Sequence, residues 1–272
     1  DMNPVLHDAT FQQLRDLIYA KCGIYIPDTK KYLVEKKIAP RLQARNLGGY
    51  EDYLAYLKYR PDDGEQAKLF DAITTNETYF FREPQQFDVL LNTVVPEAVR
   101  GRPGKDIRIW SAASSTGEEP YTISMLLMEK CPAIKAEIHA SDISGEVIAA
   151  AKKGVYGSYA VRNVPPAYLQ KYFRNTGWSY ELNAVVRNSV RFMTANLINE
   201  REMRALSNVD VIFCRNVLIY FDEKAKQKAV SLLYDSLRPG GKLIIGSSES
   251  LHNVTRAFRP VTYDKVVVYQ KP

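Results

Sequence analysis

The segment from Trp110 to Pro120 is the first place where residue types and spacing could support chemistry. An apolar run ends there in small residues, and Glu118 and Glu119 follow its only glycine, Gly117, at the start of a predicted helix. Small residues let a ligand approach the backbone, and the helix N-terminus offers unpaired N–H groups. Two carboxylates would repel a pyrophosphate but tolerate a cationic sulfonium or ammonium. The segment favours S-adenosylmethionine over a dinucleotide, although the glutamates could also simply complement the helix dipole.

Three more apolar runs end in polar residues that could belong to the same site. Asp142 follows the second run, Ala195-Asn196-Leu197 the third, and Arg215 and Asn216 the fourth. Ligands bind beyond the carboxyl ends of the strands in open parallel sheets, so these residues are candidates to meet there. An acidic residue after the second strand can accept hydrogen bonds from ribose hydroxyls. Capping of the next helix by Asp142 or Ser144 is an equally good interpretation.

The elements that must position these residues begin after the turn-rich boundary at 101–104. Apolar runs of strand length alternate with helical patterns, which predicts a mainly parallel sheet covered on both faces. Strands are expected at 106–113, 136–143, 190–194 and 242–247 and at the start of 209–221, helices at 119–130, 144–154 and 222–237, and an edge hairpin within 258–270. The alternation lapses over 155–190, where a short helix and a hairpin predict an inserted β-subdomain.

The first 72 residues have no strand pattern and read as a helical N-terminal domain. Thr10 and Asp28 are candidate N-caps of two helices, and 50–59 has apolar residues at helical spacing for a third. Residues 73–104 are interpreted as a linker that contributes to the cofactor site, and 105–272 as the cofactor-binding domain.

Composition excludes several classes of protein. The chain has 272 residues, 46% of them hydrophobic, and no apolar run approaches the length of a membrane span. No secretory signal is visible at the N-terminus, so we expect a cytoplasmic protein without membrane insertion. The three cysteines lie far apart and no Cys/His cluster occurs, so we expect neither a disulfide framework nor a metal site.

The net charge of +6 is concentrated near the N-terminus. Residues 21–45 hold seven Lys or Arg residues and two acidic ones. On an ideal helix Lys30, Lys37 and Arg41 fall within roughly 40° of one another, so they would form a continuous stripe. Such a stripe favours an acidic partner, and a solvated helix face is the simpler alternative.

Four sequence blocks, taken together, carry a resemblance to a known family. They are TTNETYFFR at 74–82, WSAASSTGEEPY at 110–121, ASDI at 140–143 and IFCRNVLIYFD at 212–222. In order and spacing they resemble the signature blocks of the chemotaxis receptor methyltransferases, the CheR family, and the resemblance covers essentially the whole chain. It implies an α/β fold: a Rossmann-like class I methyltransferase sheet, a small all-α N-terminal domain and an inserted antiparallel β-subdomain.

The resemblance also implies roles for individual residues. The cofactor pocket would be lined by Asn76, Thr78, Arg82, Glu118, Asp142, Asn196, Leu197, Arg215 and Asn216. Arg82 and Tyr220 would lie near the transferring methyl group as the catalytic pair. The basic residues Lys30, Lys37 and Arg41 would contact the acidic methylation region of a receptor.

The activity implied is methylation of chemoreceptor glutamates by S-adenosylmethionine, which gives γ-glutamyl methyl esters and S-adenosylhomocysteine. Two alternatives are an RNA or small-molecule methyltransferase and a non-catalytic S-adenosylmethionine-binding module. Nucleic-acid amino-methyltransferases usually carry an Asp/Asn-Pro-Pro-aromatic motif where this chain reads Arg215-Asn216-Val217-Leu218, so we expect no nucleic-acid partner. Some family members dock a receptor's C-terminal pentapeptide through a glycine-rich turn. The corresponding stretch 174–183 has a single glycine and two bulky aromatics, so we expect no such docking.

Overall fold

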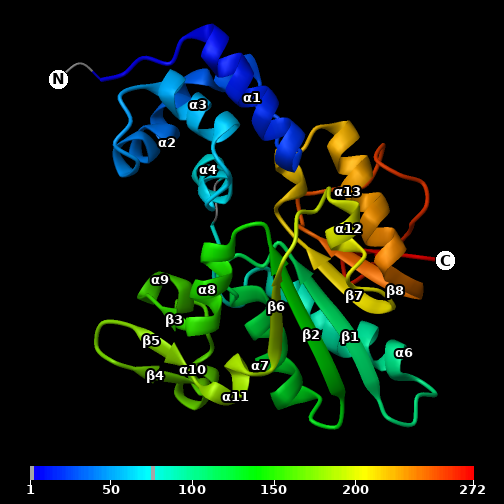
Figure 1. The fold of residues 1–272 in the computed structure, drawn as a ribbon. Helices are drawn as coiled ribbons and strands as arrows, with labels where there is room; N and C mark the ends of the chain where they lie inside the picture. The colour runs from blue at the N-terminus through cyan, green and yellow to red at the C-terminus, as the bar shows by residue number, and fades with distance from the viewer. Residues whose placement is uncertain (1–2, 75–76) are drawn as a thin grey trace. The chain divides into compact units, whose positions relative to one another are not determined.

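The computed structural model describes residues 3–74 and 77–272 and divides the chain into two compact units. We call residues 1–76 and 220–226 the helical unit, and residues 77–219 and 227–272 the sheet unit. Figure 1 traces the chain through both. Within the described residues, no helix is both long and apolar enough to cross a bilayer.

The helical unit is built from short helices around a small apolar core. They are α1 (Asp8–Cys22), the 3-10 helix η1 (Asp28–Lys30), α2 (Lys31–Ala44), α3 (Tyr50–Tyr59) and α4 (Glu65–Ile73). In α3, Glu51 and Asp52 lie in the first turn, where they complement the helix dipole, and the buried face holds Tyr53, Leu54 and Leu57. The sequence predicted α3 at these bounds, and it did not predict α4.

Both predicted N-caps in this unit are wrong. Helix α1 begins at Asp8, so Thr10 lies buried inside it and its hydroxyl donates to Glu51. Asp28 opens the 3-10 helix η1 and pairs with Arg15, and α2 begins only at Lys31. Lys30 therefore precedes α2, and the ideal-helix angle that aligned it with Lys37 and Arg41 does not apply to it.

The chain returns to the helical unit at residues 220–226. Ile24 and Phe221 form an antiparallel β-bridge, and the Tyr25 amide donates to the Tyr220 carbonyl at 2.9 Å. The Tyr19 hydroxyl lies 2.9 and 3.1 Å from the two carboxylate oxygens of Asp222. The helical unit is thus made from two separate stretches of sequence.

The sheet unit contains a seven-stranded sheet in the order β6-β2-β1-β7-β8-β10-β9. Its strands are β1 (Asp106–Ala112), β2 (Lys135–Asp142), β6 (Val190–Thr194), β7 (Val209–Cys214), β8 (Leu237–Ile245), β9 (Arg259–Tyr263) and β10 (Val266–Gln270). The first five are parallel, and β9 and β10 form an antiparallel edge hairpin. Every residue of β7 is buried, so both faces of the sheet are covered at its centre, as predicted.

The helices that come between strands of this sheet include α7 (Glu118–Lys130), α8 (Gly145–Lys153), α12 (Glu200–Met203) and α13 (Glu223–Ser236), the last of which continues from the helical unit. Helix α7 contacts β1, β2 and β6, and α8 contacts β2 and β6 (Figure 1). The α/β class, the all-α N-terminal domain and the β-subdomain all agree with the sequence prediction.

Residues 84–99, interpreted from sequence as part of a linker, are helical. They form α5 (Pro84–Val89), the π-helical turn η2 (Leu90–Val94) and α6 (Val95–Val99), and they belong to the sheet unit. Phe87, Leu90, Val94 and Val95 are buried in the core of that unit. The run therefore packs on the sheet and fixes the residues that precede it.

The inserted subdomain is a three-stranded antiparallel sheet in the order β3-β5-β4. It comprises β3 (Val155–Tyr156), α9 (Ser158–Val161), α10 (Pro166–Tyr172), β4 (Phe173–Asn175), β5 (Tyr180–Leu182) and α11 (Ala184–Arg187). The β4–β5 turn carries Trp178, whose relative exposure is 96%.

Candidate active site

The loop after β1 is strained and held in place by the end of β2. Ala113, Ser115 and Gly117 have positive φ angles of 64°, 49° and 96°. Left-handed backbone at non-glycine residues is unfavourable and persists only where the surroundings enforce it. The Ser114 amide donates to the Ser141 carbonyl at 2.8 Å, and the Ser115 amide to the Asp142 carboxylate at 2.9 Å. The loop is therefore preorganised at the carboxyl edge of the sheet.

The two glutamates that open α7 have different partners. Glu119 accepts from the Ser111 hydroxyl at 2.6 Å and from Arg215 Nε at 2.7 Å. Glu118 is 2% exposed and accepts hydrogen bonds from the hydroxyls of Thr116 and Thr78. Among the described residues, no Lys or Arg forms an ion pair with Glu118. Glu118 is thus a buried carboxylate without a counter-ion in the described part of the chain, a role that its position in the sequence alone could not distinguish from that of Glu119.

Burial determines the acidity of both carboxylates predicted for the cofactor site. Desolvation raises the pKa of Glu118, and the hydrogen bond from Thr116 offsets only part of this effect. Desolvation also raises the pKa of Asp142, opposed by hydrogen bonds from the backbone amides of Ser144 and Ser115. A buried carboxylate is stabilised by a cationic or hydrogen-bonding ligand, so both residues are suited to hold one.

Of the two residues that were candidates to cap α8, Asp142 and Ser144, the structure shows Ser144 as the cap. Ser144 is the N-cap of α8, because its hydroxyl oxygen accepts from the Val147 amide at 3.3 Å. Asp142 instead joins the end of β2 to the loop after β1, through Ser115 and through the Ser144 amide at 3.1 Å. Its contact with a ribose stays a prediction.

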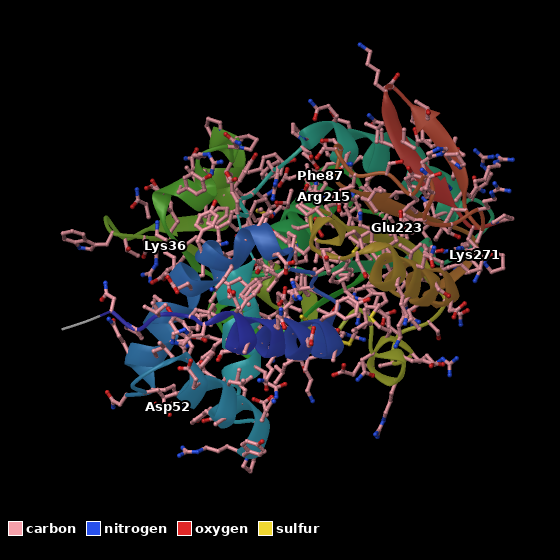
Figure 2. All side chains as sticks on the ribbon, turned by 90° about the horizontal axis from the view of Figure 1, so that it is seen from above. Lys36, Asp52, Phe87, Arg215, Glu223 and Lys271 are labelled. Atoms are coloured by element: carbon pink, nitrogen blue, oxygen red, sulfur yellow. The ribbon has the colours of Figure 1, made fainter. Side chains whose placement is uncertain are left out.

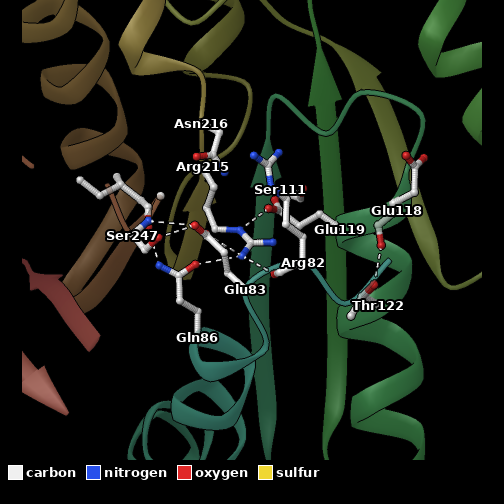
Figure 3. A network of polar contacts seen from close by, with 12 residues as sticks. Arg82, Glu83, Gln86, Ser111, Glu118, Glu119, Thr122, Arg215, Asn216 and Ser247 are labelled. Carbon is white, nitrogen blue, oxygen red and sulfur yellow. Dashed lines mark hydrogen bonds and ion pairs between the residues drawn. The ribbon is translucent and has the colours of Figure 1, made fainter. Parts of the chain in front are cut away.

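Arg215, predicted to line the cofactor pocket, is the centre of a buried polar network at the end of β7 (Figure 3). Besides Glu119, its guanidinium donates from Nη1 to the Arg82 carbonyl at 2.8 Å and to Gln86 Oε1 at 2.9 Å. It also lies 4.9 Å from the ring centroid of Phe87, and Figure 2 shows these two side chains next to each other. Arg215 therefore joins the start of α7 to the segment before α5.

Glu83 and Gln86, which the sequence analysis did not propose, tie the same segment to the end of β8. Gln86 Nε2 donates to the Ile245 carbonyl at 2.6 Å, and Glu83 accepts from both the amide and the hydroxyl of Ser247. No local sequence signal predicts the roles of Glu83 and Gln86, since these hydrogen-bond partners lie about 160 positions away in sequence.

Residues 77–82 lead into this network and carry Thr78 and Arg82. Phe80 is fully buried, and the Phe81 amide donates to the Thr122 hydroxyl at 3.2 Å. Arg82 Nη1 donates to the Glu77 carbonyl at 2.6 Å. Figure 3 shows the side chains of Arg82 and Glu118 at the same edge of the sheet. Asn76, the other candidate from this block, lies outside the described residues.

Asn216 follows Arg215 in a left-handed conformation with φ 62°. Its amide donates to Glu249 Oε1 at 2.6 Å, and that oxygen also accepts from the Gly246 amide at 2.9 Å. A Cβ atom on Gly246 would lie 2.5 Å from Asn216 Oδ1, so a larger residue there would displace the Asn216 side chain. Glu249 and Gly246 were not predicted, and they hold Asn216 at the end of β7.

The remaining candidates come from the segment after β6 and from the helical unit. Leu197 is buried, and Asn196 Oδ1 accepts from the Ile198 amide at 3.2 Å. Tyr220 ends the 3-10 helix η3 (Leu218–Tyr220) and belongs to the helical unit, so its pairing with Arg82 stays a prediction.

Of the three basic candidates, Lys30 is exposed and the other two have internal partners. Lys37 Nζ donates to the Ile73 carbonyl at 3.0 Å. Arg41 makes two hydrogen bonds of 2.7 Å to Glu65, which is 1% exposed. A structural role therefore accounts for Arg41, and its predicted contact with a receptor is untested.

Sequence comparison decides the family. The all-alpha domain of CheR methyltransferases matches residues 9–74, and their SAM binding domain matches residues 76–267. The chain belongs to the CheR methyltransferase family. It is 40% identical to chemotaxis protein methyltransferase 2 of Vibrio cholerae over 98% of this chain and 94% of that protein. It is also 37% identical to the chemotaxis protein methyltransferase of Salmonella typhimurium, over 93% of this chain and 88% of that protein.

The residues present fit the S-adenosylmethionine of a CheR methyltransferase. Glu118 is a buried carboxylate that lacks a cationic partner among the described residues, and the methionine end of the cofactor is cationic. Ser114 Oγ, in the loop after β1, is buried without a hydrogen-bond partner in the described chain. Buried polar atoms are nearly always satisfied, so this hydroxyl indicates a ligand or an ordered water.

Replacement of Asp142 with alanine tests the predicted ribose contact. We expect weaker binding of S-adenosylhomocysteine by roughly 1 to 3 kcal/mol, because two ribose hydroxyls would lose their acceptor. Isothermal titration calorimetry measures the change. Unchanged affinity in a folded variant would show that Asp142 only holds the loop after β1.

Proposed function

We propose that this protein methylates glutamate side chains of chemoreceptors in chemotactic adaptation, producing γ-glutamyl methyl esters and S-adenosylhomocysteine. The match to both CheR domains over nearly the whole chain carries the proposal, and the uncompensated Glu118 carboxylate supports it. The relatives are chemotaxis protein methyltransferases by name. The substrate would be the cytoplasmic helical region of the receptor.

When bound, S-adenosylmethionine supplies an electrophilic methyl group on a sulfonium. The chain's own residues then have two tasks, orientation of the substrate and exclusion of water. An exposed glutamate has a pKa of about 4.3, so the attacking carboxylate is already ionised at neutral pH and needs no general base. Neither task requires a covalent intermediate with the protein.

Arg82 and Tyr220 would orient the substrate carboxylate. The Arg82 guanidinium uses Nη1 on the Glu77 carbonyl, and its other N–H groups can make charge-assisted hydrogen bonds. The Tyr220 hydroxyl would donate one more. Glu118 would hold the cationic end of the cofactor, and Asp142 the ribose.

Methyl transfer from labelled S-adenosylmethionine tests the function. Purified protein is incubated with receptor-containing membranes, with RNA, or with neither, and the product is treated with mild base. We expect label on the receptor that base releases as methanol, since only the ester is base-labile. Label on RNA, or binding of the cofactor without transfer to any substrate, would contradict the proposal.

Lys30 provides the cleanest test of the basic surface, because reversal of Arg41 would place a second carboxylate beside the buried Glu65. Lys30→Glu should raise the KM for receptor and reduce the effect of added salt, and leave S-adenosylhomocysteine affinity unchanged. Initial rates at several salt concentrations measure both effects. A KM equal to that of the wild type would assign Lys30 to solvated surface.

The β-subdomain should not bind a receptor's C-terminal pentapeptide tightly. The β4–β5 turn contains one glycine, Gly177, and the bulky Trp178, and Tyr180 opens β5; these two aromatics would hinder close approach of a peptide backbone. Because Trp178 is exposed, its fluorescence should report any docking there. Titration with the free pentapeptide, monitored also by calorimetry, should give no saturable signal, and a micromolar Kd would refute the expectation.

A further inference from the structure

Arg162, at the end of α9 in the β-subdomain, lies in a corner formed by two aromatic rings. Its guanidinium carbon is 3.8 Å from the Tyr79 ring centroid and 3.6 Å from that of Tyr159. The two rings are nearly perpendicular, at 78°. Nη1 of Arg162 also donates to the Tyr159 carbonyl at 2.7 Å. A planar guanidinium over two ring faces has few other orientations, so the two rings restrain this exposed side chain.

Glu77 joins the same corner through its carboxylate. Glu77 Oε1 accepts from the Tyr159 hydroxyl and lies 3.9 Å from Arg162 Nη2. Arg162 and Tyr159 therefore hold both Glu77 and Tyr79, two residues of the irregular segment that leads to Arg82.

Arg82 contacts the same two residues, Glu77 and Tyr79. Arg82 Nη1 donates to the Glu77 carbonyl at 2.6 Å, and its guanidinium carbon is 5.7 Å from the Tyr79 ring centroid. Arg82 therefore binds the main chain of Glu77, and Tyr159 and Arg162 contact the Glu77 side chain. Both guanidinium groups lie near the Tyr79 ring.

The rest of the segment has other anchors. The Phe80 amide donates to the Ala160 carbonyl at 3.0 Å, Phe80 is fully buried, and Phe81 donates to Thr122. Thr78 contacts Glu118. Loss of Arg162 would therefore loosen Glu77 and Tyr79 and leave the fold and the contact to Glu118 in place. The group most affected would be the Arg82 side chain.

We propose that Arg162 is a positioning residue for methyl transfer, acting on Arg82 through Glu77 and Tyr79. The inference rests on the proposed function, since it takes Arg82 to orient the substrate carboxylate. A displacement of about 1 Å in such a group can lower turnover by up to a hundredfold. The side chain of Arg162 itself need not touch substrate or cofactor.

A double-mutant cycle tests the coupling. Arg162→Ala should lower kcat about tenfold in the wild-type background and leave the Kd for S-adenosylhomocysteine within about threefold. In the Arg82→Ala background, the same substitution should have almost no further effect on labelled methyl transfer. Arg162→Lys keeps the positive charge near Glu77 and loses the planar stack, so its kcat should fall between those of wild type and Arg162→Ala.

Arg191→Ala is the matched control, because Arg191 has an exposed side chain that pairs with Glu137 on the sheet, and its kcat should equal that of the wild type. An unchanged kcat in Arg162→Ala would overturn the inference. So would an equal loss of methyl transfer on Arg162→Ala in the wild-type and Arg82→Ala backgrounds. Absence of base-labile label from the wild-type enzyme would instead refute the proposed function, and the inference with it.

Discussion

Replacement of Arg215 with methionine should lower the free energy of unfolding by about 3 to 5 kcal/mol, the range for removal of one partner from a buried ion pair. The side chain of Arg215 is 2% exposed, and its loss would leave Glu119, whose side chain is 13% exposed, with the Ser111 hydroxyl as its remaining donor among the described contacts. The Arg82 carbonyl and Gln86 would lose a donor as well. Urea denaturation at neutral pH measures the change.

The control for this prediction is Arg191→Met, which removes an exposed guanidinium and should change stability by less than about 1 kcal/mol. Addition of Glu119→Gln to Arg215→Met should restore part of the loss, because it removes the stranded charge. A loss below about 1 kcal/mol for Arg215→Met would show that the network contributes little to the fold.

Glu118→Gln should have effects of opposite sign on stability and on cofactor affinity. Without cofactor, the variant should be more stable at neutral pH by roughly 1 to 3 kcal/mol, since an uncompensated buried charge is removed. Its affinity for S-adenosylmethionine should fall by about tenfold to a hundredfold, because the cationic end loses its counter-charge. Thermal unfolding and calorimetry measure the two effects.

The pH dependence of Glu118→Gln follows from the raised pKa of Glu118 in the folded state. Ionisation of this carboxyl opposes folding, so the stability that Glu118→Gln gains over the wild type is complete above the folded-state pKa. It disappears as the pH falls below the unfolded value of about 4.3. Wild-type affinity for the cofactor should weaken over the same fall in pH, as the carboxyl is protonated. Equal stability of both proteins at neutral pH would mean that Glu118 has a cation among its neighbours.

The strands and the edge on which the site lies could be predicted from sequence because their signals are local. The apolar runs that became β1, β2 and β6 end in Ala112, Asp142 and Thr194, each within one residue of the predicted end. The parallel order then brings their carboxyl ends to one edge. Glu118 and Asp142 follow directly from that argument.

What sequence could not predict depends on distant partners. Arg215 was expected at the pocket, and its partners Glu119 and Gln86 lie 96 and 129 positions away. Glu249 supports Asn216 from 33 positions away. The helical run from Pro84 begins after Glu83 in a left-handed conformation without a side-chain cap, so Pro84 at its first position is a start signal that no capping residue reinforces.

The return of residues 220–226 to the helical unit has a consequence for protein engineering. Because Phe221 bridges Ile24 and Asp222 accepts from Tyr19, a cut near residue 76 does not separate two self-contained pieces. A fragment that starts at residue 77 would retain Phe221 and Asp222 but lose both partners. A chimaera that borrows the helical domain of a relative should therefore exchange 220–226 together with it, as one inherited module.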